Sequence, residues 1–429
     1  MKYYSTNRKS PLANFQEAIF KGLPDDNGLY MPEKISALPS SFFKNLENHT
    51  LSEIGFKVLK QFVSDEIPKD VLSNIVEETL NFDIPLIEVS ENLYSLELYH
   101  GPTFAFKDVG ARFLARSLSH FTKETDQKLT VLVATSGDTG SAVAQGFYEV
   151  PNIEVIILYP SGKISDFQEQ QMTTLGKNIT ALEVDGSFDD CQKMVKQAFL
   201  DEELTEKANL TSANSINIAR LLPQSIYYFY SLGQLPQEKR NEVVISVPSG
   251  NYGNLSAGLI AQRMGLKINH FLACSNINDT VPEYLKTSKY SAKTSTETIS
   301  NAMDVGDPSN FARMLDLFSG SHKQMTESIT GYSFTDDETR KAIKSVYEKS
   351  GYILDPHGAV GFLGLQKYLD KNSGTGIFLE TAHPYKFKET VENEIDEPLT
   401  PVLEFKSKEK KSIAFGNDFE ELKERLMST

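Results

Sequence analysis

The strongest constraint on the fold of this chain is an alternation of short β-branched runs with amphipathic helical segments. Six runs stand out, in two series: residues 129–134, 153–159, 179–184, 242–247, 268–273 and 376–380. Strands that alternate with helices at this spacing form βαβ units, which build a parallel sheet with helices on its faces. The sequence therefore predicts an α/β protein with two αβ domains and parallel-type sheets around a cleft.

The helical segments divide the chain further. Helices are predicted to begin near Thr139, Ser165 and Phe188, to cover 216–232 and to follow a capping box at Thr335. Before residue 90, amphipathic stretches at 10–20, 51–62 and 69–80 predict a mostly helical layer. We therefore predict an N-terminal helical domain at 1–90, a smaller αβ domain at 91–210 and a larger αβ domain at 211–429.

Charge and cysteine content exclude several classes of function. The formal net charge of -15 argues against nucleic acid or an anionic membrane as a main partner, because both need clustered positive charge. No signal-like start and no run of ~18 apolar residues is present, so we expect a cytoplasmic protein without a membrane partner. Cys191 and Cys274 form no metal-ligand pattern, so neither structural zinc nor a disulfide framework is expected.

Lys107 is the first candidate catalytic residue. It follows a predicted strand at 93–98 and stands where a helix begins. Phe104 and Phe106 flank it, and partial desolvation lowers the pKa of an amine and frees it to attack a carbonyl. A surface lysine that closes a loop is the alternative reading of this position alone.

Two glycine-containing loops follow predicted strands and open helices. Residues 248–254 offer converging backbone N–H groups suited to a phosphate, although a plain strand-to-helix turn fits equally well. Residues 134–142 offer hydroxyls and helix-start N–H groups suited to a carboxylate, with an N-capped helix as the alternative. Asp138 is out of place in a carboxylate site, so we expect its side chain to turn to a phenolic or amine donor.

A fourth loop follows the strand at 376–380. Thr381 ends that strand and can give a hydroxyl to a ligand ring, whereas His383 fits a hydrogen-bonded loop residue better than a catalytic base. A desolvated lysine and a phosphate-type cradle at neighbouring loops predict one cofactor that carries an aldehyde and a phosphate. Pyridoxal phosphate has both groups.

Several motifs together resemble those of the threonine synthase family. They are Gly101-Pro102-Thr103-Phe104-Ala105-Phe106-Lys107-Asp108, Thr135-Ser136-Gly137-Asp138-Thr139-Gly140-Ser141, Asn214-Ser215-Ile216-Asn217-Ile218-Ala219-Arg220, Pro248-Ser249-Gly250-Asn251-Tyr252-Gly253-Asn254, Asp355-Pro356-His357-Gly358-Ala359 and Glu380-Thr381-Ala382-His383-Pro384. The resemblance covers nearly the whole chain and is to the microbial and fungal branch with an extra N-terminal domain. Tyr252 and Ile218 depart from the residues common in the family, phenylalanine and an aromatic residue respectively.

The resemblance implies a fold, a cofactor and a reaction. The fold is that of fold-type-II pyridoxal-phosphate enzymes, similar to the tryptophan synthase β subunit. The reaction is that of a carbon–oxygen lyase acting on phosphates, which converts O-phospho-L-homoserine and water to L-threonine and phosphate. Lys107 is implied as the Schiff-base lysine and proton-transfer group, and Thr381 as the residue facing the pyridine nitrogen. The residues implied to bind the cofactor phosphate are Gly250, Asn251, Tyr252, Gly253 and Asn254.

The resemblance also implies a substrate site. The loop implied to hold the substrate carboxylate contributes Ser136, Gly137, Asp138, Thr139 and Ser141. Candidates for the substrate phosphate are the cations Arg112, Lys163 and Arg220, with Asn217 and Ser161 as neutral donors. Surface pairing of these cations with acidic residues is the alternative.

Two rival functions stay open from the sequence. A serine/threonine dehydratase, or a lyase for other phosphorylated amino alcohols, would use the same lysine, but a dehydratase has no reason for two phosphate-sized sites. A binding protein without turnover would be expected to show degraded loops, and these loops are intact. We expect a monomer or weak homodimer.

Overall fold

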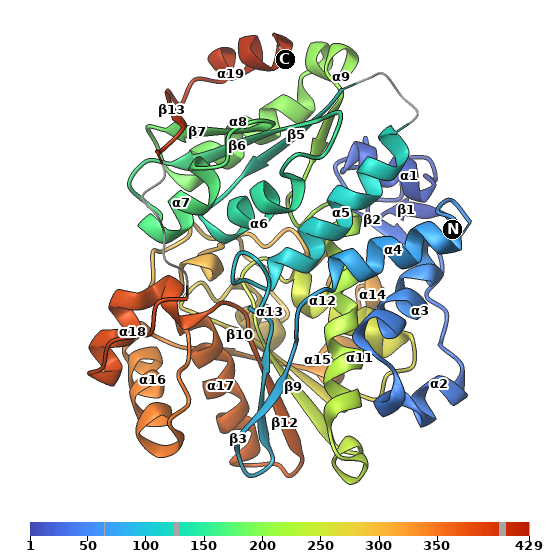
Figure 1. Ribbon diagram of the computed structural model, residues 1–429. Helices are drawn as coiled ribbons and strands as arrows, with labels where there is room; N and C mark the ends of the chain where they lie inside the picture. The colour runs from blue at the N-terminus through green and yellow to red at the C-terminus, as the bar shows by residue number, and fades with distance from the viewer. Residues whose placement is uncertain (64, 124–127, 403–408, 429) are drawn as a thin grey trace.

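The computed structural model describes residues 1–429 except 64, 124–127, 403–408 and 429. Two sheets dominate it, with the smaller in the upper part of Figure 1 and the larger in the lower part. The N-terminal helices lie to one side of both sheets. The helix α5 (Lys107–Thr122) begins between the two sheets and runs toward these N-terminal helices (Figure 1).

The larger sheet has six strands, and its central strands are buried along their whole length. Their order is β11 (Ile329–Ser333), β10 (His270–Ser275), β9 (Val243–Pro248), β12 (Thr375–Glu380), β4 (Leu93–Glu97) and β3 (Leu86–Ser90). All pairs are parallel except β3 with β4, and Ile377 of β12 pairs with both Tyr94 and Ile245. Parallel sheets covered on both faces need such continuous apolar strands.

The smaller sheet is entirely parallel. Its order is β13 (Ser412–Phe415), β7 (Ile179–Val184), β6 (Ile153–Pro160), β5 (Leu129–Ala134) and β8 (Leu210–Ser212). The helices that follow its strands are α6 (Asp138–Phe147), α7 (Asp166–Thr173), α8 (Phe188–Leu200), α9 (Glu202–Lys207) and α19 (Phe419–Met427).

The remaining helices after α5 are α10 (Ile218–Leu221), η2 (Leu222–Gln224), α11 (Ser225–Gln234), η3 (Gln237–Arg240), α12 (Gly253–Arg263), α13 (Thr280–Thr287), η4 (Asn301–Met303), α14 (Phe311–Leu317), α15 (His322–Ser328), α16 (Asp336–Ser350), α17 (Pro356–Leu369), η5 (Pro384–Phe387) and α18 (Lys388–Ile395). Among them, α13, α15 and α17 pack directly on the larger sheet, and most of the others pack on neighbouring helices.

The N-terminal layer is helical apart from one short ribbon. Its elements are β1 (Tyr3–Ser5), α1 (Phe15–Lys21), β2 (Tyr30–Pro32), α2 (Ser40–Lys44), η1 (Leu46–Asn48), α3 (Leu51–Val63) and α4 (Lys69–Thr79). The apolar positions of α3 recur at helical spacing and are buried, and Tyr3 OH donates to Phe62 O at 2.8 Å. These residues belong to the same hydrophobic core as α5 and α11, so the layer packs directly on the αβ part.

The elements agree with most of the predicted ones. All six predicted strands form, and α6, α7 and α8 begin within one residue of the predicted starts. The capping box at Thr335 is present, with its hydroxyl and the Glu338 carboxylate exchanging bonds with the first turn of α16. The predicted helix at 216–232 is broken into α10, η2 and α11, because Pro223 cannot donate a helical hydrogen bond.

The sheets do not follow the predicted domain boundaries. The strands β3 and β4 join the larger sheet although they precede the smaller one in the chain. At the other end, β13 leaves the larger domain and pairs in parallel with β7 of the smaller sheet. Within the described residues, no helix combines the length and apolar character that a membrane span requires.

Candidate active site

Lys107 is held beside the carboxyl end of β12. Residues 104–106 form an antiparallel bridge with residues 381–383, in which Phe106 N donates to Thr381 O at 2.9 Å. The lysine is therefore tied by main-chain bonds to the strand end that carries Thr381.

The turn before α5 is closed by Asp108. Thr103 donates to its carboxylate twice, from the backbone N–H at 2.9 Å and from the hydroxyl at 2.5 Å. A Cβ at Gly101 would lie 2.5 Å from Asp108 Oδ2, so this turn needs the glycine. The buried carboxylate thus fixes where α5 begins.

The Lys107 amine is poorly hydrated and lies against a carboxylate. Its side chain is 16 % exposed, and Nζ is 3.4 Å from Asp138 Oδ2 and 5.6 Å from the Phe106 ring centre. Burial lowers the pKa of Lys107, the Asp138 charge opposes this, and the charges of Lys386 and Arg220 lower it further. The predicted partial desolvation of this lysine is confirmed.

Asp138 joins Lys107 to a second buried amine. Its Oδ1 lies 2.6 Å from Lys386 Nζ and accepts from Gln168 Nε2 at 2.9 Å. Burial opposes ionisation, but the charges of Lys386 and Lys107 hold the pKa of Asp138 well below its usual range. The expectation that Asp138 turns to an amine donor is confirmed.

Lys386 is a site residue that the sequence analysis did not select. It lies in η5, its side chain is fully buried, and Nζ also donates to Thr103 O at 3.0 Å. A lysine is seldom fully buried unless it is paired. The available signal was its place five residues after Thr381, in the same loop at the end of β12.

In the loop between β5 and α6, some polar groups are hydrogen-bonded within the protein and others are not. Thr135 Oγ1 accepts from Gly137 N and Gly140 N at 2.9 and 2.8 Å, and Ser141 Oγ donates to Gly137 O at 3.1 Å. Among the described residues, the half-buried hydroxyls of Ser136 and Thr139 have no partner. Those two hydroxyls and the start of α6 are thus the groups that remain for a carboxylate.

The loop between β9 and α12 is held by its asparagine side chains. Asn251 donates to Ser215 Oγ at 2.6 Å and accepts from Ser309 N at 2.6 Å. Asn254 donates to Pro248 O at 2.8 Å across the turn. These bonds fix the loop without using its own N–H groups.

The same loop presents consecutive free donors. Within the described residues, the backbone N–H groups of 250–254 donate to no protein acceptor. Tyr252 has a left-handed backbone with φ 58°, which turns the chain into α12. A run of free N–H groups at a helix start fits a phosphate, so these residues suit the phosphate of the implied cofactor.

Thr381 is buried at the end of β12, and within the described residues its hydroxyl has no partner. The preceding residue, Glu380, accepts from Asp355 N at 2.5 Å and lies against Gly358, where a Cβ would meet its Oε2. Asp355 in turn binds His357 Nδ1 at 2.6 Å. Burial, and then the Asp355 carboxylate, raise the pKa of Glu380 well above its ordinary value.

The predicted cations are dispersed. Arg112 donates to Glu78 O and, at 2.8 Å, to Asn81 Oδ1, so it joins α5 to the N-terminal layer. Lys163 is exposed and lies 3.6 Å from Glu297. The structure thus brings neither of them into contact with Lys107 or Asp138.

The neutral candidates serve the fold. Asn217 donates to Ile19 O and Ser212 O, both at 3.0 Å, and its Oδ1 accepts from Ala219 N. Ser161 Oγ donates to Glu183 at 2.8 Å. All polar atoms of Asn217 are thereby used at the start of α10.

Arg220 differs from the other cations. It is 3 % exposed, packs on α5 at Gly110 and donates to Ala213 O. Among the described residues, no carboxylate lies at ion-pair distance, and its Nε has no partner. Burial lowers the pKa of Arg220 to about 10, and its charge acts on Lys107. It is therefore a buried cation close enough to Lys107 to act on its pKa, and within the described residues it lacks an ion-pair partner.

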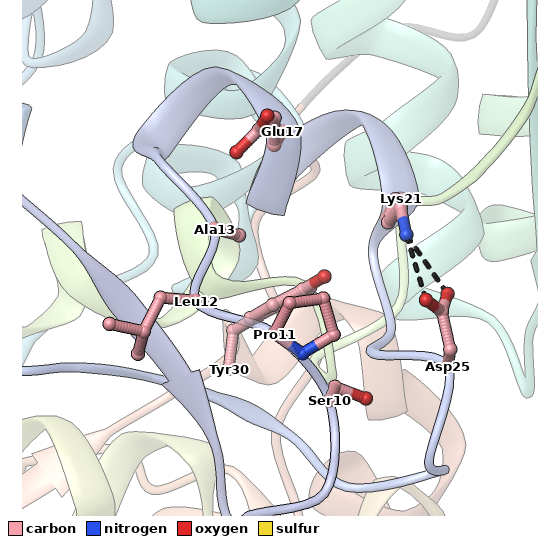
Figure 2. Close-up of a pocket in the computed structure, with 8 residues that line it drawn as sticks. All are labelled: Ser10, Pro11, Leu12, Ala13, Glu17, Lys21, Asp25 and Tyr30. Atoms are coloured by element: carbon pink, nitrogen blue, oxygen red, sulfur yellow. Dashed lines mark hydrogen bonds and ion pairs between the residues drawn. The ribbon is translucent and has the colours of Figure 1, made fainter.

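A separate pocket of about 120 Å³ lies in the N-terminal layer (Figure 2). Among the residues that line it, the Lys21 ammonium and the Asp25 carboxylate form an ion pair (Figure 2). None of its lining residues belongs to the four loops around Lys107, so we do not assign it to the candidate active site.

The comparisons with known proteins agree with this geometry. The family described as pyridoxal-phosphate dependent enzyme matches residues 82–377, and that described as threonine synthase N terminus matches residues 2–80. The chain is 46% identical over 433 residues to the threonine synthase of Haemophilus influenzae, with 100% of both chains covered.

Solved structures give the same result. The threonine synthase of Escherichia coli superposes with a TM-score of 0.93 at 41% identity, covering 100% of both chains. A threonine synthase from Brucella melitensis with bound pyridoxal phosphate gives a TM-score of 0.92 at 33% identity, covering 100% of this chain and 99% of that one.

Replacing Glu380 by glutamine is expected to change how stability depends on pH. The Glu380 pKa is raised in the folded protein, so folding favours the protonated carboxyl. Its stabilising contribution to the free energy of unfolding is complete below about pH 4.3, the ordinary pKa of glutamate, and is lost as the pH rises toward the folded pKa. In urea unfolding between pH 5 and 8, the free energy of unfolding of Glu380→Gln should rise relative to that of the parent protein by up to about 1.4 kcal/mol per pH unit. Exposed Glu348→Gln is the control, and parallel curves for Glu380→Gln and parent would contradict the prediction.

Replacing Lys386 by methionine is expected to raise the pKa of Lys107. The variant removes a positive charge that lowers this pKa and leaves Asp138 to pair with Lys107 alone. Pyridoxal phosphate added to cofactor-free protein restores the visible absorbance of the covalently bound cofactor. The midpoint of the pH profile of this rate should lie about one pH unit higher in the variant than in the parent. Lys388→Met, an exposed lysine nearby, is the control. An unchanged pH profile in Lys386→Met would refute the proposed coupling.

Proposed function

Because the chain belongs to the threonine synthase family of pyridoxal-phosphate-dependent enzymes, we propose that it converts O-phospho-L-homoserine and water to L-threonine and phosphate. The enzyme acts on a small molecule and uses pyridoxal phosphate. The observation that carries the proposal furthest is the Lys107 amine, 3.4 Å from Asp138 and tied to the end of β12 beside Thr381.

The proposed cofactor contacts follow from the free groups at the site. Lys107 binds the aldehyde covalently, and the N–H groups of 250–254 bind the phosphate. The Thr381 hydroxyl faces the pyridine nitrogen, and a neutral partner there leaves this nitrogen largely unprotonated. When bound, pyridoxal phosphate supplies an electron sink for carbanions next to the substrate amine.

The proposed substrate contacts use the remaining groups. Ser136, Thr139 and the first turn of α6 hold the carboxylate. Arg220 binds the phosphate, because it is the buried cation at this site that lacks an ion-pair partner among the described residues. Asp138, Gly137 and Ser141 contribute by shaping the loop rather than by contact with the substrate.

The proposed proton transfers need one amine near successive carbons. Once the substrate amine has freed it, Lys107 Nζ removes the proton at Cα and must release this proton before it removes the proton at Cβ. As the bond between Cγ and the phosphate oxygen breaks, Arg220 neutralises the leaving phosphate, which takes up one of the two protons, and the other proton returns to Cγ. Water then adds its hydroxyl at Cβ, and its proton goes to Cα. Asp138 keeps the ammonium form of Lys107 in place between these transfers.

The assembly and the compartment are further parts of the proposal. We propose a monomer or weak homodimer in the cytoplasm. Cys191 and Cys274 are free and buried, which fits a reducing compartment.

The first test is the product balance. Purified protein given O-phospho-L-homoserine should release phosphate and threonine in equal amounts, and only when pyridoxal phosphate is bound. Phosphate with 2-oxobutyrate would indicate a lyase, turnover of threonine a dehydratase, and no turnover with bound cofactor a binding protein. Lys107→Ala should lose both the visible cofactor absorbance and the activity, and an unchanged rate would refute its assigned role.

Arg220→Met is expected to lower kcat/KM for O-phospho-L-homoserine by about a hundredfold or more, because a charged hydrogen bond to the substrate phosphate is lost. The visible absorbance of the bound cofactor should stay. Arg116→Met on the outer part of α5 is the control, since that arginine pairs with Glu78. Equal effects of the two substitutions would show that Arg220 does not bind the substrate phosphate.

A further inference from the structure

Arg313 is a fully buried arginine outside the set of predicted site residues. It lies in the first turn of α14, and its side chain is 0 % exposed. Within the described residues, no carboxylate lies at ion-pair distance from it. Burial alone lowers the pKa of its guanidinium, to about 9. A buried cation of this kind is costly unless an opposite charge lies close by.

The guanidinium is bound by neutral acceptors from three parts of the chain. Its Nη1 donates to Ser215 O at 3.0 Å and to Asn310 Oδ1 at 2.6 Å. Its Nη2 donates to Ile216 O at 2.6 Å and to Tyr30 O at 3.2 Å. Arg313 therefore joins β2 of the N-terminal layer to the segment before α10.

These partners lie directly behind the loop of residues 250–254. Ser215 Oγ accepts from Asn251 Nδ2 at 2.6 Å and from Asn310 Nδ2 at 3.2 Å. A Cβ added to Gly253 would lie 3.5 Å from Asn310 Nδ2 and 3.7 Å from Ser215 Cβ. The positive charge is thus separated by one layer of side chains from five backbone N–H groups that have no acceptor within the described part of the chain.

We propose that Arg313 is a positioning residue that strengthens binding of the cofactor phosphate to the loop of residues 250–254. Its positive charge attracts the phosphate, and its hydrogen bond to Asn310 supports the Asn310–Ser215–Asn251 hydrogen bonds that shape the loop. The bound phosphate then provides the negative charge that no carboxylate provides within the described residues. The inference depends on the proposed function only for the identity of the cofactor. Any phosphate monoester bound to this loop would be attracted by the charge of Arg313 in the same way. It also makes the N-terminal layer, through Tyr30 O, part of the phosphate site.

The test compares two ligands that differ only in the phosphate. Pyridoxine 5′-phosphate and pyridoxine both lack the aldehyde, so calorimetry with cofactor-free protein measures binding without covalent attachment to Lys107. In Arg313→Gln, which removes the charge and keeps an amide donor, the affinity for the phosphorylated ligand should fall about tenfold or more relative to pyridoxine. Arg313→Lys keeps the charge and should lose less of this ratio.

Arg240→Gln is the matched control. Arg240 also donates to backbone carbonyls, those of Leu235 and Gly233, and it pairs with Glu47. It precedes the start of β9, whereas this loop follows the end of that strand. Its substitution should lower stability without changing the ratio of affinities. If the two ligands lose affinity equally in Arg313→Gln, or if Arg240→Gln changes the ratio as much, the proposal is wrong.

A second measurement separates this inference from the proposed reaction. Inorganic phosphate should raise the Tm of cofactor-free parent protein, and should raise that of Arg313→Gln less. This holds whether or not threonine is formed. A parent protein that makes threonine while phosphate protects both proteins equally would overturn the inference and leave the function standing.

Discussion

The ion pair of Asp138 with two lysines is the interaction on which the candidate site depends. The carboxylate comes from the start of α6, which follows β5 of the smaller sheet, whereas Lys386 comes from η5, which follows β12 of the larger sheet, and Lys107 comes from α5. One buried charge thus joins three elements that approach from different directions. Without it, two amines would be buried with no counter-charge, which is more costly than an unmade hydrogen bond.

The predictable part of the fold was the part set by local pattern. Strands such as 129–134 and 179–184 are β-branched and bounded by turns, so their periodicity alone locates them. The short strands β8 and β13 were missed, because three or four residues carry no clear period and form only by pairing with β5 and β7. The sheet that each strand joins also depends on partners far away in the chain. For this reason β3 and β4 belong to the larger sheet, although the larger αβ domain was predicted to begin only at residue 211.

The candidate site divides in the same way. Lys107, Thr381 and the glycine loops stand at strand ends, where position in the pattern reveals them. Lys386 and Arg313 were missed because their environment is made by residues far away in the chain, Asp138 for one and Tyr30 for the other. Arg112 and Asn217 were selected because their side chains suit a phosphate, and in the structure both bind backbone carbonyls within the fold.

The pairing of β13 with β7 has a consequence for the order in which the chain is completed. Synthesis proceeds from the N-terminus, so β5, β6, β7 and β8 emerge long before residues 412–415. During that interval β7 is an open edge of a parallel sheet, and such an edge can pair with another chain. The nascent protein therefore exposes the β7 edge until residues 412–415 have been synthesised, and the smaller sheet lacks its fifth strand until then.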